Sequence, residues 1–123
     1  MAVAAQLGYK AIAITDPDTL SGIVLAYSFL KQNPDAGTRF IVGCRLNLSN
    51  GSSLLCYPTN RTAYGRLTRL LTLGKRRAEK GKCNLSLADV AEHSDDQHFI
   101  IPFPEVLADS AAQHIKTCAA MFQ

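Results

Sequence analysis

Two acidic side chains, two residues apart, directly follow a short apolar run and are the residues best placed to do chemistry. The run covers residues 10–15, and the carboxylates belong to Asp16 and Asp18, with Pro17 between them. Hard divalent cations prefer oxygen ligands, so this pair is a candidate metal site. The structural alternative is that Asp16 opens a turn before Pro17 while Asp18 or Thr19 caps the next helix.

The histidines and cysteines lack the spacing of a metal site or of a nucleophile with its base. No H-x-H or H-x-x-x-H pattern occurs, and no C-x-x-C pair is present. A glycine-rich phosphate loop and a Ser-His-Asp order are missing as well. We interpret the histidines as surface or helix-end residues and the cysteines as thiols in a reducing cytosol. These residues are His93, His98 and His114, and Cys44, Cys56, Cys83 and Cys118.

Positive charge is concentrated in residues 61–82. This segment holds eight of the 13 lysines and arginines and one acid, Glu79, whereas the rest of the chain is mildly acidic. Such a cluster fits DNA phosphates or an acidic protein surface, and the alternative is a solvated helix end. Tyr57 and Tyr64 are candidates for stacking on bases, although Tyr64 also falls on an apolar helix stripe. We expect the docking candidates on one exposed face: Arg66, Arg69, Lys75, Arg76, Arg77, Lys80 and Lys82.

Helices and strands alternate along the chain, which predicts an α/β fold with parallel central strands. In such folds the chemistry lies at the carboxyl ends of the strands. We expect Gly74 to end the third helix, and Tyr27 to lie on the buried face of the second. The predicted elements are helices over 2–8, 20–31, 61–73, 86–91 and within 104–122, strands over 10–15, 39–48, 53–57 and 98–103, a turn at Asn50-Gly51 and a basic loop over 75–82.

The composition places the chain among globular proteins of about one domain. Of its 123 residues, 47% are hydrophobic and 19% are charged, which argues against a disordered tail. No apolar run approaches the roughly 18 residues that a membrane-spanning helix needs, and no secretory signal pattern opens the chain. These features predict a cytoplasmic protein without a membrane partner.

Several segments resemble a known family. Residues 13–22, AITDPDTLSG, look like the second motif of the PHP (polymerase and histidinol phosphatase) domain, and residues 40–46, FIVGCRL, resemble its next strand. Residues 53–67 and 70–83 are similar to the N-terminal PHP region of bacterial C-family error-prone DNA polymerases, relatives of the polymerase III α subunit. The resemblance implies a partial distorted (β/α)7 barrel over residues 1–103, without its first strand, plus a β-hairpin. Residues 104–123 match only as a C-terminal helix.

The departures from that family concern its metal ligands. Where metal-dependent members carry a histidine, this chain has Pro17, and a carboxylate ligand is replaced by Arg45. The resemblance therefore implies a degenerate site at Asp16, Pro17 and Arg45, with no catalytic residue and no metal in this chain. It implies Mg²⁺ only for the parent polymerase.

The resemblance favours a non-catalytic scaffolding module of an error-prone, translesion DNA polymerase that serves DNA repair. Its partners would be the other polymerase domains, DNA at the basic segment, and a sliding clamp or accessory translesion proteins through the parent. Two alternatives stay open: a metal-dependent phosphoesterase or 3′–5′ exonuclease, and a small nucleic-acid-binding module built on residues 61–82. An unpaired edge beside the strand at 10–15 would also favour self-association.

Overall fold

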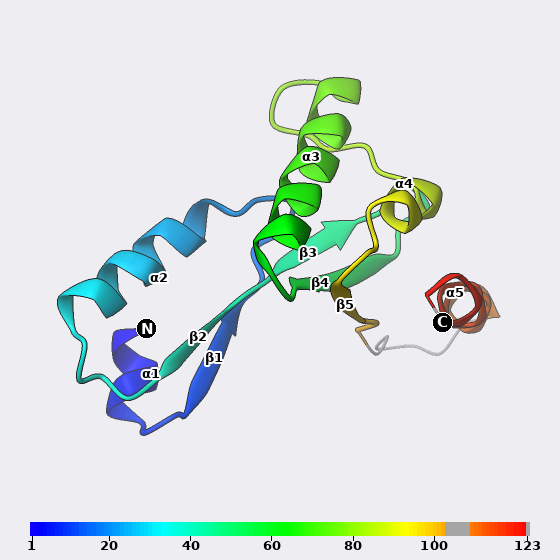
Figure 1. Ribbon diagram of the computed structural model, residues 1–123. Helices are drawn as coiled ribbons and strands as arrows, with labels where there is room; N and C mark the ends of the chain where they lie inside the picture. Colours follow the sequence, from blue (N-terminus) through cyan, green and yellow to red (C-terminus); the bar gives the residue numbers. More distant parts are fainter. Residues whose placement is uncertain (103–108, 123) are drawn as a thin grey trace.

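The computed structural model describes residues 1–102 and 109–122 and shows two packed parts joined where one sheet ends and the next begins (Figure 1). The first part contains a two-stranded parallel sheet and two helices: α1 (Ala2–Gln6), β1 (Ala11–Ile14), α2 (Ser21–Gln32) and β2 (Arg39–Val42). The second contains a three-stranded antiparallel sheet in the order β3-β4-β5 and three helices: β3 (Cys44–Asn47), β4 (Ser53–Pro58), α3 (Arg61–Arg77), α4 (Leu87–Glu92), β5 (Gln97–Ile100) and α5 (Asp109–Met121).

The single strand predicted over 39–48 is divided at Gly43. Its first half pairs with β1 in parallel, and its second half pairs with β4 in antiparallel register. Gly43 is buried, and a Cβ there would lie 2.9 Å from both the Thr15 Cγ2 atom and the Tyr57 Cε1 atom. The chain can therefore change sheets at this point because the residue has no side chain.

The sheet arrangement corrects the expectation of parallel central strands. Among the described residues only β1 and β2 pair in parallel, since β5 pairs antiparallel to β4, with Cys56 opposite Phe99. The two sheets are separate and form no closed barrel within residues 1–102 and 109–122. The protein therefore has a mixed α/β fold, because β5 pairs with the free edge of the β3–β4 hairpin and not with the parallel sheet.

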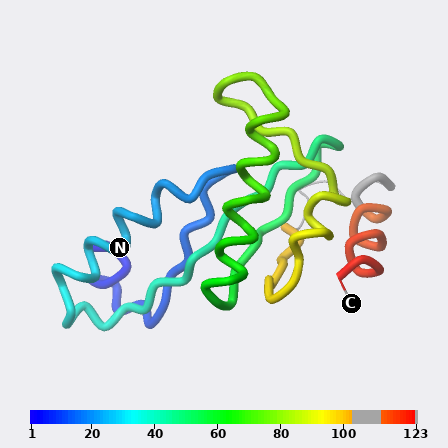
Figure 2. The backbone as a smooth tube through the Cα atoms, turned by 45° about the horizontal axis from the view of Figure 1, so that its top comes forward, coloured from blue at the N-terminus to red at the C-terminus, as the bar shows by residue number. Residues whose placement is uncertain are grey.

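The hydrophobic core lies almost entirely in the second part, between the antiparallel sheet and the helices that cover it (Figure 2). Leu46 and Leu54 from the sheet and Leu67 from α3 are completely buried. The core cluster consists of Cys44, Leu46, Leu48, Leu54, Cys56, Leu67, Leu70, Leu71, Leu85, Val90 and Cys118. Burial of this apolar surface is the main stabilising contribution to this part of the fold.

The first part leaves much of its apolar surface exposed. All four residues of β1 are only half-buried, although parallel strands usually have both faces covered. On α2, Ala26 is buried, but the expected burial of Tyr27 is wrong, since this residue is 63% exposed. Val24 and Leu25 are also exposed, so this helix carries apolar residues on its outer face as well as its inner face.

The start of α3 is as predicted, but its end is not. The Asn60 side chain accepts a hydrogen bond from the Ala63 N–H at 2.8 Å, which caps the helix. Gly74 does not terminate it; the helix continues to Arg77, and Gly74 is buried inside it. The reason is packing, because the Cys83–Leu85 stretch crosses the helix where Gly74 has no side chain.

Two other local signals from the sequence are confirmed. The helix predicted over 86–91 is α4, and Ser86 and Asp89 form a capping box at its start. The Asn50-Gly51 hairpin is present, with residues 48–52 joining β3 to β4 and Gly51 at φ +87°. The predicted strand over 98–103 corresponds to β5, which begins at Gln97.

The C-terminal helix α5 packs against the antiparallel sheet. Cys118 is part of the core, and the Phe122 ring stacks on Phe99 with centroids 4.5 Å apart. Residues 104–108, the first part of the stretch 104–122 in which a helix is predicted, lie outside the described residues. Among the residues that the structure describes, no helix is long and apolar enough to span a membrane.

Candidate functional site

The loop after β1 is hydrogen-bonded to β3, and this contact brings together Pro17 and Arg45, the positions at which the family resemblance implies replaced metal ligands. The Arg45 N–H donates to the Asp16 carbonyl at 3.1 Å, and the Asp18 N–H donates to the Arg45 carbonyl at 2.8 Å. Pro17 and Arg45 therefore face each other as a parallel bridge pair. Asp16, Pro17 and Arg45, the residues of the predicted degenerate site, thus meet at the carboxyl end of β1.

The two carboxylates of this loop turn to different partners. Asp16 lies against Gly22 in the first turn of α2, where a negative charge is favourable. Asp18 has a left-handed backbone, at φ +53°, and its carboxylate accepts hydrogen bonds from the Asn47 main-chain N–H at 3.0 Å and the Asn47 Nδ2 at 3.3 Å. Asp18 is therefore not the helix cap.

The helix cap at this position is weaker than expected. The Ser21 N–H donates to the Thr19 Oγ1 at 3.2 Å, one residue before the formal cap, Leu20, which has no side-chain cap bond. Of the two capping candidates, Thr19 is the one that contacts the helix start. Asp18 is instead held against β3, because the bridge to Arg45 fixes its backbone there.

Arg45 places a positive charge at the centre of this arrangement. Its side chain is exposed, and its Nη2 donates to the Ser53 Oγ at 3.1 Å. A guanidinium offers donors only and cannot ligate a cation, and proline has no side-chain donor atom at all. Within residues 1–102 and 109–122, no group of three or more His, Cys, Asp or Glu side chains is close enough together to hold a metal ion.

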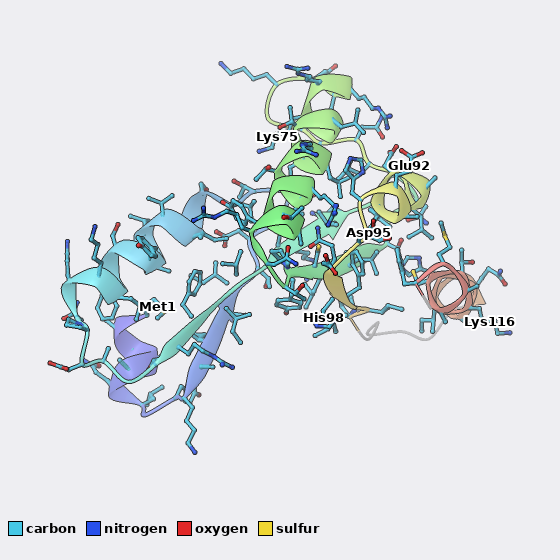
Figure 3. All side chains as sticks on the ribbon, in the orientation of Figure 1. Met1, Lys75, Glu92, Asp95, His98 and Lys116 are labelled. Carbon is cyan, nitrogen blue, oxygen red and sulfur yellow. The ribbon has the colours of Figure 1, made fainter. Side chains whose placement is uncertain are left out.

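The histidines are separated from this loop and from one another. The His93 Nδ1 is 2.8 Å from the Asp89 carbonyl at the end of α4, and the His114 Nδ1 is 3.2 Å from the Ser52 Oγ. His98 is exposed on β5 (Figure 3). His93 and His98 are helix-end and surface residues, as expected, whereas His114 is half-buried within α5, between Ser52 and Cys118.

The four cysteines are free thiols. Cys44 and Cys56 face each other across β3 and β4, and burial raises the pKa of the Cys44 thiol to about 11 and that of Cys56 to about 12. Burial also raises the pKa of the Cys83 and Cys118 thiols. Thiolates are the reactive form, so these raised pKa values disfavour a nucleophilic role, and Cys44, Cys56 and Cys118 are buried in the core.

The basic segment does not present one common face, which corrects the sequence expectation. Arg77 forms an ion pair with Asp89 at 2.7 Å, and Arg66 lies 3.8 Å from the Asp96 carboxylate. Both arginines belong to the side of α3 that faces α4 and the turn before β5. Arg69 and Arg76, seven residues apart, lie on the outward side, because residues at this spacing share a helix face.

The counter-charges that divide the segment come from residues distant in sequence. Inside the segment the sequence offers only Glu79, which does pair with Lys82 at 3.6 Å. Asp89 and Asp96 could not be recognised as partners beforehand, because ion pairs between separate elements leave no sequence pattern. In the structure, Asp89 also forms the capping box with Ser86, which fixes its carboxylate near the end of α3.

The remaining lysines line a groove beside the strand-end loop. This groove has a volume of about 820 Å³ and separates the carboxyl end of β1 from the end of α3 and the loop that follows. Figure 3 shows Lys75 near that end of α3. The lining contains neither Tyr57 nor Tyr64, which are both half-buried. The lining residues are Pro17, Asp18, Thr19, Lys75, Glu79, Lys80, Gly81, Lys82 and Cys83.

Comparison with known proteins finds relatives among bacterial polymerases. The chain is 48% identical over 117 residues to the error-prone DNA polymerase of Caulobacter vibrioides, covering 94% of the chain and 10% of that protein. It is 43% identical over 119 residues to the error-prone DNA polymerase of Allorhizobium ampelinum, covering 97% and 10%. No family model matches the chain.

The similarity includes the C-terminal helix. With error-prone DNA polymerase 2 of Rhizobium meliloti, the identity is 40% over 121 residues, or 98% of the chain and 11% of that protein. The aligned stretch thus reaches into residues 104–123. The chain spans about one tenth of the length of these relatives, so it is homologous to a segment of an error-prone DNA polymerase.

Proposed function

We propose that the chain is an N-terminal PHP-type module of an error-prone, translesion DNA polymerase related to the polymerase III α subunit, and that this module is a non-catalytic scaffold. The observation that carries the proposal is the pairing of Pro17 with Arg45 at the carboxyl end of β1. Both positions correspond to metal ligands in the family that the sequence resembles. Here one side chain has no donor atom and the other is a cation.

A hydrolytic site at this loop would need several converging ligands. Hydrolysis by metal-dependent enzymes uses a bound cation to activate water and to polarise the phosphoester. Asp16 and Asp18 turn apart, and Asp18 is already engaged by Asn47. These residues do not fit a metal centre, and this favours the scaffold over a phosphoesterase or exonuclease. Mg²⁺ would be used by the polymerase at a site outside this chain.

In this proposal the partners of the chain are the other domains of the polymerase, in the bacterial cytoplasm. A sliding clamp and accessory translesion proteins would be reached through the whole enzyme. Exposed apolar residues in α1, in the segment directly after it and in α2 support the contact with other domains, because exposed apolar patches mark interaction surfaces. The six side chains are Val3, Leu7, Tyr9, Val24, Leu25 and Tyr27.

The purified chain is expected to bind no stoichiometric Zn²⁺ or Mn²⁺ and to hydrolyse no phosphoester. The physical reason is that Pro17 and Arg45 supply no ligand at the strand-end loop. Elemental analysis after dialysis against each metal, together with a p-nitrophenyl phosphate and an exonuclease assay, measures this. About one metal ion per chain that is lost on Asp16→Ala would contradict the proposal and restore the hydrolase.

In the absence of the other polymerase domains, two copies of the chain are expected to associate through the exposed face of α2. Val24, Leu25 and Tyr27 are 67%, 76% and 63% exposed, and their burial between copies would remove apolar surface from water. Sedimentation velocity over a concentration series measures the association. The substitutions Val24→Thr, Leu25→Gln and Tyr27→Gln should shift the chain to monomer.

A matched set on the same helix provides the control. Ser28, Lys31 and Gln32 are exposed and polar, and their replacement by alanine leaves the apolar side chains in place. The control variant should associate as the original chain does. If the original chain stays monomeric at every concentration, this face of α2 does not drive association between copies, and the prediction is wrong.

A further inference from the structure

The groove between the strand-end loop and the end of α3 collects lysines from two directions. Lys75 belongs to the last turn of α3, whereas Lys80 and Lys82 belong to the loop that returns beneath it. Gly81, at φ +85°, forms the turn between these two lysines. Three lysines therefore border one open space of about 820 Å³.

The two acidic residues of the groove, Asp18 and Glu79, do not prevent an anion from binding to the lysines. Asp18 accepts two hydrogen bonds from Asn47, so its charge is directed toward β3. Glu79 and Lys82 form an exposed pair, with side chains 86% and 73% exposed, and such pairs contribute little in water. An incoming anion can replace Glu79 as the partner of Lys82. Lys75 and Lys80 form no ion pair within the described residues.

The other lining groups point to recognition by charge alone. Burial, with the nearby Asp18 charge, raises the pKa of the Cys83 thiol, so it adds no negative charge at neutral pH. Among the residues that the structure describes, no aromatic side chain lines the groove, so none of them offers base stacking there. Lysine binds phosphate as a point charge without geometric selection among bases.

We propose that this groove binds the phosphodiester backbone of a DNA strand through Lys75, Lys80 and Lys82, independently of base sequence. The inference rests on the proposed function, since DNA is the polyanion that an error-prone polymerase module meets. It assigns the DNA contact to one part of the basic segment. Arg66 and Arg77 are excluded from this contact, because their charges are directed to the acids beside α4.

The test is the salt dependence of binding to a fluorescein-labelled oligothymidine, measured by anisotropy with the full chain. Each phosphate that a lysine neutralises on a single strand contributes about 0.7 to the slope of log K against log salt. The variant with Lys75→Ala, Lys80→Ala and Lys82→Ala should therefore lose about 2 from this slope. A mixed-sequence oligonucleotide of the same length should give the same slope as oligothymidine.

The matched control removes the same charge from the other part of the molecule. Lys10, Lys31 and Arg39 are exposed residues of the first part, and their replacement by alanine should leave the slope unchanged. Circular dichroism checks that both variants are folded, and Lys→Gln versions keep the side-chain length without the charge.

Three results would overturn the inference. Equal losses of slope in both variants would mean that only the net charge of the chain determines the salt dependence. The other two are an unchanged slope in the groove variant and no DNA binding by the original chain. In the last case an acidic surface of an adjoining domain would be the partner of these lysines. None of these outcomes affects the metal-binding test of the strand-end loop, so failure of the groove and failure of the proposed function are distinguishable.

Discussion

Replacing Gly74 with alanine is expected to destabilise the chain by about 1–3 kcal/mol, although alanine is the better helix former. A Cβ at this position would lie 2.5 Å from the Cys83 Sγ and 2.7–2.8 Å from the Leu85 Cγ and Cδ2 atoms. Leu85 is completely buried in the core, so it cannot move away without loss of packing. Urea unfolding followed by circular dichroism measures the change in the free energy of unfolding.

The same helix supplies the control. A Cβ on Gly65 would have no atom within 4 Å outside its own stretch of helix, so alanine fits there without a clash. Gly65→Ala should stabilise the chain by about 0.5–1 kcal/mol, because glycine loses more backbone entropy on folding. If both substitutions stabilise the chain, α3 does not pack on Leu85 as described. Opposite signs would support this packing.

The second large effect is expected at Asp89, which joins the end of α3 to the start of α4. Its carboxylate accepts hydrogen bonds from the Ser86 N–H and hydroxyl, both at 2.9 Å, and from the Arg77 Nη1 at 2.7 Å. Asp89 is 8% exposed, and its side chain 11%. Asp89→Ala should cost about 2–3 kcal/mol, because it removes charge-assisted hydrogen bonds together with the capping box.

This contribution should depend on pH in a defined direction. Burial by itself raises the pKa of the Asp89 carboxyl, but the hydrogen bonds from Ser86 and Arg77 outweigh burial and hold the pKa below its ordinary value of 3.8. Because the pKa of Asp89 is lower in the folded than in the unfolded state, its ionised carboxylate stabilises the fold above pH 3.8. This contribution to the free energy of unfolding is lost as the pH falls through the folded-state pKa. The difference in stability between the original chain and Asp89→Ala should thus narrow below about pH 4.

An exposed ion pair in the same region gives the comparison. Glu79→Ala removes the partner of Lys82, and both side chains are largely exposed. The loss should stay below about 1 kcal/mol and should disappear in high salt. Equal effects of Asp89→Ala and Glu79→Ala would mean that the bond to Arg77 is no stronger than a surface pair.

The local elements could be predicted from sequence because their signals are local. Asn60 and Ser86 each cap a helix through a side chain within three residues of its bonding partner. The Asn50-Gly51 turn and the alternation after Cys44 fixed the hairpin in the same way. The resemblance also singled out Pro17 and Arg45, which the structure brings together as a bridge pair.

Sequence alone determined the strand-end loop, the hairpin, the helix starts and the concentration of charge in residues 61–82. Tertiary structure decided where strands and charges find their partners. Gly43 lies inside a run that reads as one strand, and only packing against Thr15 and Tyr57 divides it between two sheets. Gly74 reads as a helix end, and only contact with Leu85 keeps it inside α3. Pairing between distant residues depends on the folded path of the chain, so Asp89 and Asp96 could divide the basic segment only after folding had brought them to α3.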